Sequence, residues 1–332
     1  MTQDDNTVPG LDGTILVTGA GGFVGRHLLA ALSGEFTLQG PRIAVGRAGT
    51  AQLARLEQPW IAAYCDLTDD ADVDALIREH KPAVIVHLAA QASIAGAFAD
   101  GAAETWRTNF LSTLNLARSV ARHVPGSTFL FSSSADVYGR AFLDGRVNET
   151  SLPVPQNSYA RSKIACEQLL ADILPTDSRL IITRPTNHSG KGQDPGYVLP
   201  NFAAQVVAIE RGTAPPVLKV GNLQVERDII HVQDVVHAIV DLLKMTDDLP
   251  SRATFNICSG RPVLLSKVVD DLISMSGCAI EVEPDPDRFR PVDIPRAEAS
   301  PAALQEVIGW APPSDITAIL RDVLDDQRSN AA

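Results

Sequence analysis

Tyr159 and Lys163 lie four residues apart in the segment 158–163. Residues i and i+4 share one face of a helix, so the phenol and the ammonium can point into a single pocket. A phenol normally titrates at a pH of about 10, and a fixed cation beside it favours the phenolate and lowers its pKa. The spacing therefore predicts that Tyr159 exchanges a proton near neutral pH. Because such spacing is also common on solvated helix faces, its meaning depends on the surrounding elements.

Three glycines with the spacing Gly-x-x-Gly-x-x-Gly, at 19, 22 and 25, follow an apolar run at 14–17 and lead into an expected helix at about 22–33. The first permits a tight turn, the second lets the backbone approach a pyrophosphate, and the third allows close helix–strand packing. The helix N-terminus adds free N–H groups and a positive dipole end. This order predicts a dinucleotide-binding loop, with a plain flexible turn as the alternative. The residues assigned to the cofactor here are Gly19, Gly22, Phe23, Val24 and Gly25.

The ends of the next two expected strands, 42–45 and 61–64, bear on the choice of cofactor. A site that prefers NADH usually places an acid after the second strand, but this chain has Arg47 there. Arg47 can bind a 2′-phosphate, so we expect NADPH to be favoured over NADH; a plain surface residue is the alternative. Asp66 and Leu67 follow the third strand and are assigned to the adenine end, with a helix cap as the alternative role for Asp66.

Short apolar runs alternate with amphipathic segments over the first half of the chain. Continuous apolar strands are typical of a parallel sheet that helices cover on both faces. We therefore expect an α/β fold with a Rossmann-type, doubly wound parallel sheet that binds its ligand at the carboxyl ends of the strands. The expected strands are 14–17, 42–45, 61–64, 83–88, 128–131 and 180–183, and the later expected helices are about 69–79, about 102–122 and the segment that carries Tyr159.

Proline and glycine become frequent after residue 184, and strands become sparser. This change predicts a smaller C-terminal, substrate-binding lobe that is interleaved with returns to the sheet. The expected boundaries are 11–185 plus about 228–256 for the dinucleotide-binding domain, and about 186–227 plus 257–330 for the lobe. Residues 1–10 are expected to be a disordered lead-in.

Composition argues against several classes of partner. The formal net charge of −12 disfavours nucleic acid and anionic membranes as the main partner. The four cysteines form no Cys-x-x-Cys motif, and the seven histidines show no metal-binding spacing, so we expect reduced thiols and no metal site. The acidic, polar start and the short apolar runs predict no signal peptide, no membrane span and a cytoplasmic location.

These motifs and several others, in the same order, resemble the extended short-chain dehydrogenase/reductase superfamily, which includes NAD-dependent epimerases and dehydratases. The likeness runs over 19–310, nearly the whole chain. It implies a catalytic trio of Ser134, Tyr159 and Lys163, and a helical Asn109 that can hold a water in the proton path. The further cofactor contacts that it implies are Leu88, Ala89, Ala90, Gln91, Tyr159, Lys163, Pro185 and Asn187.

The second half is similar to the GDP-4-keto-6-deoxy-mannose reductases of this superfamily. Segment 184–193 matches their Arg-Pro-x-Asn-His-x-Gly-x-Gly-Gln pattern, and 220–228 and 287–295 match as well. GDP-mannose 4,6-dehydratases share parts of this pattern, but their phosphate loop usually reads Gly-x-Thr-Gly-Gln-Asp-Gly. They also usually carry Thr and Glu where this chain has Ser134 and Asp136. The likeness therefore favours a reductase.

Such an enzyme is an oxidoreductase that reduces the C4 ketone of a GDP-4-keto-6-deoxy-hexose to a GDP-rhamnose type of product. By resemblance, Tyr159 would protonate the C4 oxygen, Ser134 would hydrogen-bond it, and Lys163 would lower the Tyr159 pKa and bind the nicotinamide ribose. Asp136 is expected to bind substrate rather than to act as a base, and Tyr138 is expected to be a packing residue. The residues assigned to the substrate are Ser134, Asp136, Asn187, His188, Val198, Arg227 and Arg290.

Other functions and a quaternary structure follow from the same resemblance. One alternative is a nucleotide-sugar 4,6-dehydratase or 4-epimerase that acts on GDP-mannose or a UDP-sugar with tightly bound NAD(P). Another is a non-catalytic, cofactor-sensing protein. The superfamily also implies a homodimer through a four-helix interface of 102–122 and the Tyr159 helix, with ordinary packing against the sheet as the alternative. Small residues permit close helix contact there: Ala117, Ala121, Ala165 and Ala171.

Overall fold

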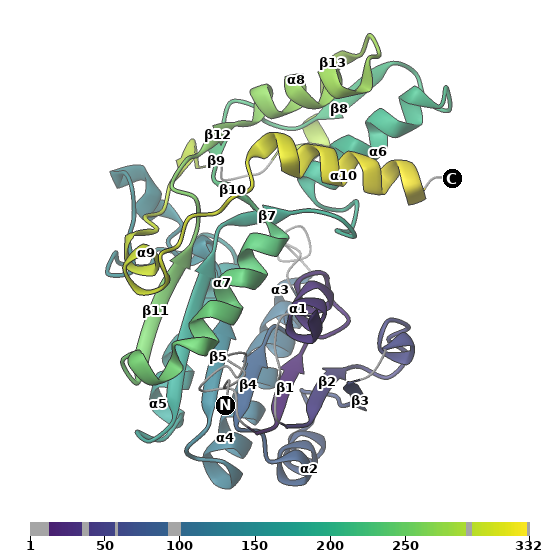
Figure 1. Cartoon of the computed structure of the whole chain (residues 1–332). Helices are drawn as coiled ribbons and strands as arrows, with labels where there is room; N and C mark the ends of the chain where they lie inside the picture. Colours follow the sequence, from purple (N-terminus) through teal and green to yellow (C-terminus); the bar gives the residue numbers. More distant parts are fainter. Residues whose placement is uncertain (1–12, 35–39, 57–58, 92–100, 290–293, 331–332) are drawn as a thin grey trace, which may run out of the picture.

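The computed structural model of the chain describes residues 13–34, 40–56, 59–91, 101–289 and 294–330. A parallel sheet with flanking helices forms the larger part, and a smaller lobe lies beyond the carboxyl ends of its strands (Figure 1). The expected disordered lead-in, 1–10, lies outside the described residues, and so does Arg290.

Within the described residues, seven parallel strands form one sheet in the order β11-β6-β5-β4-β1-β2-β3. The apolar strands β1 and β4 are buried along their whole length, as strands covered on both faces must be. The strand order reverses direction between β1 and β4, and doubly wound sheets place ligands at the carboxyl ends of such strands. The strands are β1 (Ile15–Thr18), β2 (Arg42–Gly46), β3 (Trp60–Tyr64), β4 (Val84–His87), β5 (Thr128–Ser132), β6 (Arg179–Pro185) and β11 (Arg252–Ile257).

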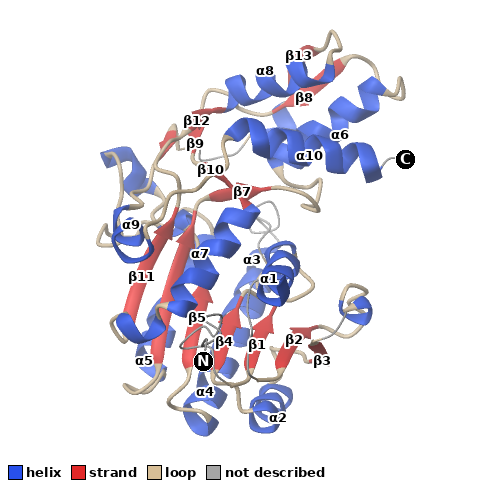
Figure 2. Ribbon diagram, in the orientation of Figure 1, coloured by secondary structure: helices blue, strands red, loops and turns tan. Residues whose placement is uncertain are grey.

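Helices cover both faces of this sheet (Figures 1 and 2). On one face, α1 (Phe23–Gly34) and α7 (Val232–Lys244) bury their apolar stripes. On the other face, α2 (Asp70–His80), α4 (Ser112–His123) and α5 (Ser158–Ile173) do the same. The predicted α/β, doubly wound fold is therefore confirmed.

Two helical segments near the site have features that bear on it: the start of α5 and a π-turn between α3 and α4. Asn157 accepts a hydrogen bond from the Ala160 N–H at 2.8 Å and so begins α5, which places Tyr159 in its first turn. The expected helix at 102–122 is instead α3 (Ala102–Trp106), a π-helical turn (η4, Arg107–Leu111) and then α4. Single π-turns often occur at functional sites, and this one carries Asn109.

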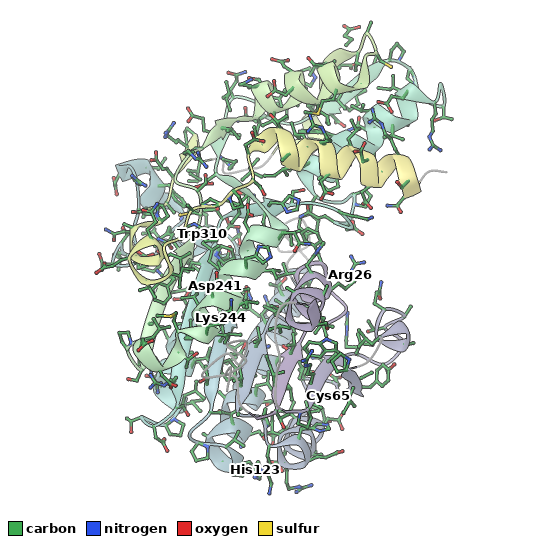
Figure 3. The ribbon with its side chains drawn as sticks, in the orientation of Figure 1. Arg26, Cys65, His123, Asp241, Lys244 and Trp310 are labelled. Atoms are coloured by element: carbon green, nitrogen blue, oxygen red, sulfur yellow. The ribbon has the colours of Figure 1, made fainter. Side chains whose placement is uncertain are left out.

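The smaller lobe has a core of its own, separate from the two apolar layers that cover the sheet. Between α8 and α10 the chain returns to the sheet: α9 (Ala302–Ile308) lies against β11, and Trp310, labelled in Figure 3, donates its indole N–H to the Cys258 carbonyl at 2.8 Å. Two sets of short strands join the lobe to the sheet: β7 (Asn187–Ser189) with β10 (Ile229–His231), and β9 (Glu226–Arg227) between β12 (Val263–Leu264) and β14 (Arg296–Ala297). The elements of the lobe are α6 (Val198–Glu210), α8 (Leu265–Ser276), α10 (Ile316–Asn330), β8 (Val217–Val220) and β13 (Glu281–Pro284).

Candidate active site

Tyr159 and Lys163 are buried on one face of α5, with 9% and 3% of their surface exposed. The Lys163 ammonium donates a hydrogen bond to the Ser132 carbonyl at the end of β5, at an Nζ–O distance of 2.6 Å. It also lies 4.7 Å from the centre of the Phe131 ring and 5.9 Å from the centre of the Tyr159 ring. The two groups therefore meet at the carboxyl end of a central strand.

Burial controls the protonation of Tyr159. Removal from water raises the pKa of its phenol well above the usual range, and the charge of Asp136 raises it further, whereas a hydrogen bond with Ser134 acts in the opposite direction. The expectation that Lys163 lowers this pKa is not met in this structure. The reason is that the ammonium is held by the Ser132 carbonyl and that burial dominates.

Burial also lowers the pKa of Lys163 to about 8, a shift that the nearby Cys166 and Glu167 partly oppose. Lys163 therefore carries its charge below a pH of about 8 and loses it above.

Ser134 follows β5 and begins a short 3₁₀ turn, η5 (Ala135–Val137). Its hydroxyl accepts a hydrogen bond from the Asp136 N–H at 3.1 Å, and the residue is buried. Since this hydroxyl is also a hydrogen-bond partner of Tyr159, the two groups face the same space, with the half-buried Asp136 beside them. The structure thus brings together Ser134, Asp136, Tyr159 and Lys163.

Asn109 connects two parts of the site through its side chain. Its Oδ1 accepts a hydrogen bond from the Gln91 N–H at 2.7 Å, and its Nδ2 donates to the Ser162 hydroxyl at 3.0 Å. Ser162 in turn donates to the Tyr159 carbonyl at 2.8 Å. The π-turn thereby ties the segment after β4 to the first turns of α5.

The loop between β1 and α1 adopts a shape that demands glycine at two positions. Gly19 has a φ of +69°, and a Cβ there would lie 2.7 Å from the Ala89 nitrogen. A Cβ at Gly25 would collide with the Gly19 carbonyl. Gly22 is exposed just before α1 begins. This cradle fits a dinucleotide, whose pyrophosphate the N–H groups of a helix N-terminus bind well.

The segment after β4 lies against this loop through Thr18. The Leu88 and Ala89 N–H groups donate to the Thr18 carbonyl and hydroxyl, each at 3.3 Å, and the same hydroxyl contacts His87 Nδ1 at 2.7 Å. Sequence reasoning assigned no role to Thr18 or His87, although each is a polar residue at the end of an apolar strand. The cofactor residues predicted in this segment are all half-buried: Leu88, Ala89, Ala90 and Gln91.

A cavity of about 340 Å³ lies at the carboxyl ends of β2 and β3. It brings together the predicted cofactor residues Arg47 and Asp66, both exposed. Asp66 does not cap α2, because Asp69 does so. Instead its carboxylate accepts hydrogen bonds from Thr68, which hold its pKa below the usual range. The Leu67 side chain packs into the core. The cavity is lined by Arg47, Ala48, Tyr64, Cys65, Asp66 and Asp72, of which Cys65 is labelled in Figure 3.

The predicted residues at the start of the second half spread from the sheet into the lobe. Pro185 ends β6, and Asn187 is exposed at the start of β7. The His188 ring lies parallel to the Phe23 ring, with 6.1 Å between their centres, so it borders the glycine loop. Val198 begins α6 and is 38% exposed.

Arg227 lies on β9, and its guanidinium donates to the backbone carbonyls of Glu226 and Ile294 at 2.9 and 2.6 Å. The neighbouring Asp228 is buried and accepts hydrogen bonds from Ser259. Backbone groups of the lobe therefore help to fix the position of Arg227.

Residues 190–193 join the sheet to the lobe, a role that sequence reasoning missed. Arg26 and His27 on α1 contact two carbonyls of this loop at 2.8 and 2.9 Å (Arg26 is labelled in Figure 3). Asp322 and Asp326 on α10 accept hydrogen bonds from two of its N–H groups at 2.6 and 2.9 Å. Part of the matched motif 184–193 thus has a structural role.

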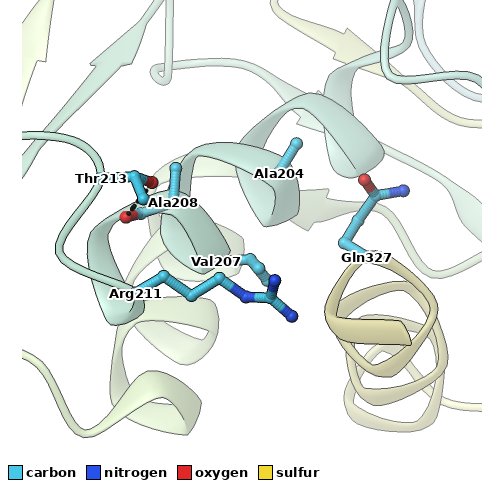
Figure 4. A pocket seen from close by; sticks show the side chains of 6 residues that line it. All are labelled: Ala204, Val207, Ala208, Arg211, Thr213 and Gln327. Atoms are coloured by element: carbon cyan, nitrogen blue, oxygen red, sulfur yellow. Dashed lines mark hydrogen bonds between the residues drawn. The ribbon is translucent and has the colours of Figure 1, made fainter. Parts of the chain in front are cut away.

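Other features lie apart from this site. A cavity of about 260 Å³ lies between α6 and α10, and none of the predicted site residues lines it (Figure 4). Among the residues that the structure describes, no cluster of three or more His, Cys, Asp or Glu could hold a metal ion. In the described part of the chain, no helix is both long and apolar enough to span a bilayer. The side chains that line the cavity between α6 and α10 are Ala204, Val207, Ala208, Arg211, Thr213 and Gln327.

The doubly wound sheet and the glycine cradle define a dinucleotide-dependent α/β enzyme. A family model described as the NAD dependent epimerase/dehydratase family matches residues 15–258. The chain belongs to this family, whose enzymes depend on NAD(P).

Relatives of known name cover nearly the whole chain. It is 33% identical to the GDP-6-deoxy-D-mannose reductase of Pseudomonas aeruginosa, over 95% of this chain and 97% of that protein. A solved structure described as RMD from Pseudomonas aeruginosa complexed with NADPH is 31% identical, with a TM-score of 0.79 over 96% of this chain and 99% of that one. The UDP-glucose 4-epimerase of Stenotrophomonas maltophila, solved with NAD and formylated UDP-arabinopyranose, is 25% identical with a TM-score of 0.82, over 96% and 99%. The predicted superfamily is therefore confirmed.

Proposed function

We propose that this chain reduces the C4 ketone of a GDP-4-keto-6-deoxy-hexose, with NADPH as the favoured cofactor. The observation that carries the proposal is the buried Tyr159 phenol beside the Ser134 hydroxyl, where burial raises the phenol pKa. The 33% identity with a GDP-6-deoxy-D-mannose reductase supports the choice of reaction and of substrate. The separate core of the lobe supports the two-domain division, with the lobe binding the nucleotide sugar.

The glycine cradle would hold the pyrophosphate, and Arg47 and Asp66 would hold the adenosine end. When bound, the cofactor supplies a hydride to C4 of the sugar. Tyr159 donates its phenol proton to the C4 oxygen, and the Ser134 hydroxyl hydrogen-bonds that oxygen as negative charge develops. Lys163, whose ammonium is held by the Ser132 carbonyl, would bind the nicotinamide ribose. The residues that would hold the nicotinamide end are Leu88, Ala89, Ala90, Gln91, Lys163, Pro185 and Asn187.

At the substrate end, Asp136 lies closest to the proposed chemistry, since its charge reaches Tyr159. We propose that it hydrogen-bonds the sugar. Two guanidinium groups suit a diphosphate, because each can make bidentate contacts. The residues proposed for the rest of the nucleotide sugar are Asn187, His188, Val198, Arg227 and Arg290.

A second candidate is a nucleotide-sugar 4-epimerase or 4,6-dehydratase that retains its cofactor. The TM-score of 0.82 to a UDP-glucose 4-epimerase favours it. The non-catalytic alternative is disfavoured, because the family consists of enzymes.

The decisive experiment incubates the purified protein with GDP-4-keto-6-deoxy-mannose and NADPH and follows the absorbance of NADPH. We expect one NADPH to be oxidised for each sugar reduced. Conversion of GDP-mannose or UDP-glucose without net cofactor consumption would contradict the proposal and support the second candidate.

Cofactor choice is tested by Arg47→Ala. Loss of charge-assisted hydrogen bonds to a 2′-phosphate should raise the KM for NADPH by roughly 10-fold or more and leave the KM for NADH nearly unchanged. An equal loss with both cofactors would contradict a 2′-phosphate role for Arg47.

A further inference from the structure

Glu167 lies one helical turn beyond Lys163 on α5, and only 3% of it is exposed. Its carboxylate accepts hydrogen bonds from Arg184 Nε at 3.1 Å and from Arg184 Nη2 at 2.6 Å. It also accepts a hydrogen bond from the Ser133 hydroxyl. A buried, bidentate ion pair thus holds the residue that immediately precedes Ser134.

The guanidinium of Arg184 reaches the other end of the same segment. Its Nη1 donates to the Tyr138 hydroxyl at 2.9 Å, and its central carbon lies 5.0 Å from the centre of the Tyr138 ring. The Tyr138 hydroxyl then donates to Asn256 Oδ1 on β11 at 2.8 Å. Tyr138 is fully buried, as a packing residue must be, but it also has two polar partners.

We propose that Glu167 and Arg184 are positioning residues that clamp segment 133–138 at both ends and so aim Ser134 and Asp136 at the reacting sugar. The inference rests on the proposed function, because it assigns Ser134 and Asp136 to the reaction. Neither member of the ion pair needs to contact substrate or cofactor for this role.

The free-energy cost of burying Glu167 and Arg184 is consistent with a positioning role rather than a purely stabilising one. Burying an ion pair is costly, and apolar side chains of similar volume often stabilise a core as well or better. Hydrogen bonds to nearly all polar atoms of both side chains offset part of this cost. The pair lies where β5, β6, β11 and α5 meet at one short turn. Rigid support of this kind keeps reacting groups within the narrow geometry that catalysis requires.

The clamp also acts on Lys163 through charge. Glu167 and Cys166 on α5 raise the pKa of Lys163, while burial lowers it. From β4, the neighbouring titratable group is His87, which is neutral because burial lowers its pKa to about 3. Loss of the Glu167 charge should therefore let Lys163 lose its proton at a lower pH.

The first test removes the clamp hydroxyls and leaves the ion pair intact. Ser133→Ala, Tyr138→Phe and the double variant should each lower kcat for sugar reduction, the double variant by roughly 10- to 100-fold, with the KM for NADPH unchanged. The matched control is Ser178→Ala, which removes an equally buried hydroxyl just before β6, at the opposite end of that strand, and should leave kcat unchanged. A double variant with wild-type kcat would overturn the proposal.

The second test uses Glu167→Gln and the pH profile of kcat. We expect the alkaline limb to move to lower pH, whereas a purely structural defect would lower kcat without moving that limb. If this variant does not fold, the hydroxyl variants still decide the question.

Failure of the proposed function can be distinguished from failure of the clamp. If the proposed function is wrong, the wild type will not oxidise NADPH with the keto sugar. In that case crystal structures of the double variant and the Ser178→Ala control decide the positional claim alone. Displacement of segment 133–138 in the double variant supports the clamp, and an unmoved segment overturns it.

Discussion

At the scale of single residues, burial rather than charge pairing determines the state of the candidate proton donor. The phenolate of Tyr159 would have to exist away from water and near Asp136, so the phenol keeps its proton. The phenol is therefore in the protonated form that a proton donor must have, although its raised pKa makes it a weaker acid than a free phenol. The same burial brings the pKa of Lys163 to about 8, so its charge is sensitive to mildly alkaline pH.

Tyr159→Phe removes the hydroxyl and keeps the ring. A general acid typically contributes about 10²- to 10⁴-fold to a rate, so we expect kcat for sugar reduction to fall by that factor. The dissociation constant for NADPH, measured by fluorescence titration, should stay close to that of the wild type. A variant that retains wild-type kcat would remove Tyr159 from the mechanism.

His87 offers a pH test that does not depend on activity. It is fully buried between Thr18 and Thr113, and burial lowers its pKa to about 3. Because the unfolded chain gains a proton near a pH of about 6.5 and the folded chain does not, this contribution to stability is complete above that pH and is lost as pH falls towards 3. We expect a loss of about 2 kcal/mol at a pH of about 5. Urea unfolding should show a smaller acid loss for His87→Asn than for the wild type or the control His80→Asn.

At the scale of elements, close backbone approach shapes the cofactor loop. The first turn of α1 passes so close to the Gly19 carbonyl that a side chain at Gly25 has no space, whereas Gly34 at the end of the same helix meets open space. The loop, the helix start and the segment after β4 therefore form one unit.

Gly25→Ala and Gly34→Ala form a matched pair on α1. Overpacking at Gly25 should lower the free energy of unfolding by about 1–3 kcal/mol and weaken the binding of NADPH. Gly34→Ala should be neutral or slightly stabilising, since alanine favours the helix. Thermal unfolding with and without NADPH measures both effects. Equal stabilisation of the Gly25→Ala protein and the wild type by NADPH would refute the proposed cradle.

The larger elements were predictable from sequence because continuous apolar runs specify buried parallel strands. The π-turn at Asn109 was not, since one extra residue in a turn leaves no clear mark in the apolar pattern. The raised pKa of Tyr159 depends on depth of burial, which residue spacing does not encode. The partners of Glu167 and of loop 190–193 come from distant parts of the chain, so only the fold reveals them.

At the scale of the whole molecule, we propose a homodimer through α4 and α5. Ala117 is fully buried against the sheet, so it does not serve the interface that we expected it to join. Ala121 and Ala165 are half-buried and Ala171 is exposed, so these three can meet a partner helix. Sedimentation at micromolar concentration should give a dimer, and Ala171→Glu should shift it towards monomer without loss of thermal stability. A monomeric wild type would contradict the proposal.

The last helix, α10, holds loop 190–193 through Asp322 and Asp326 and supplies Leu320 and Val323 to the core of the lobe. Every residue that we assign to catalysis is encoded well before it. A truncation before α10 should nevertheless inactivate the protein, because the lobe would lose part of its core and the contacts of Asp322 and Asp326 with loop 190–193. Variants in the codons of α10 therefore need the same scrutiny as variants in the catalytic codons.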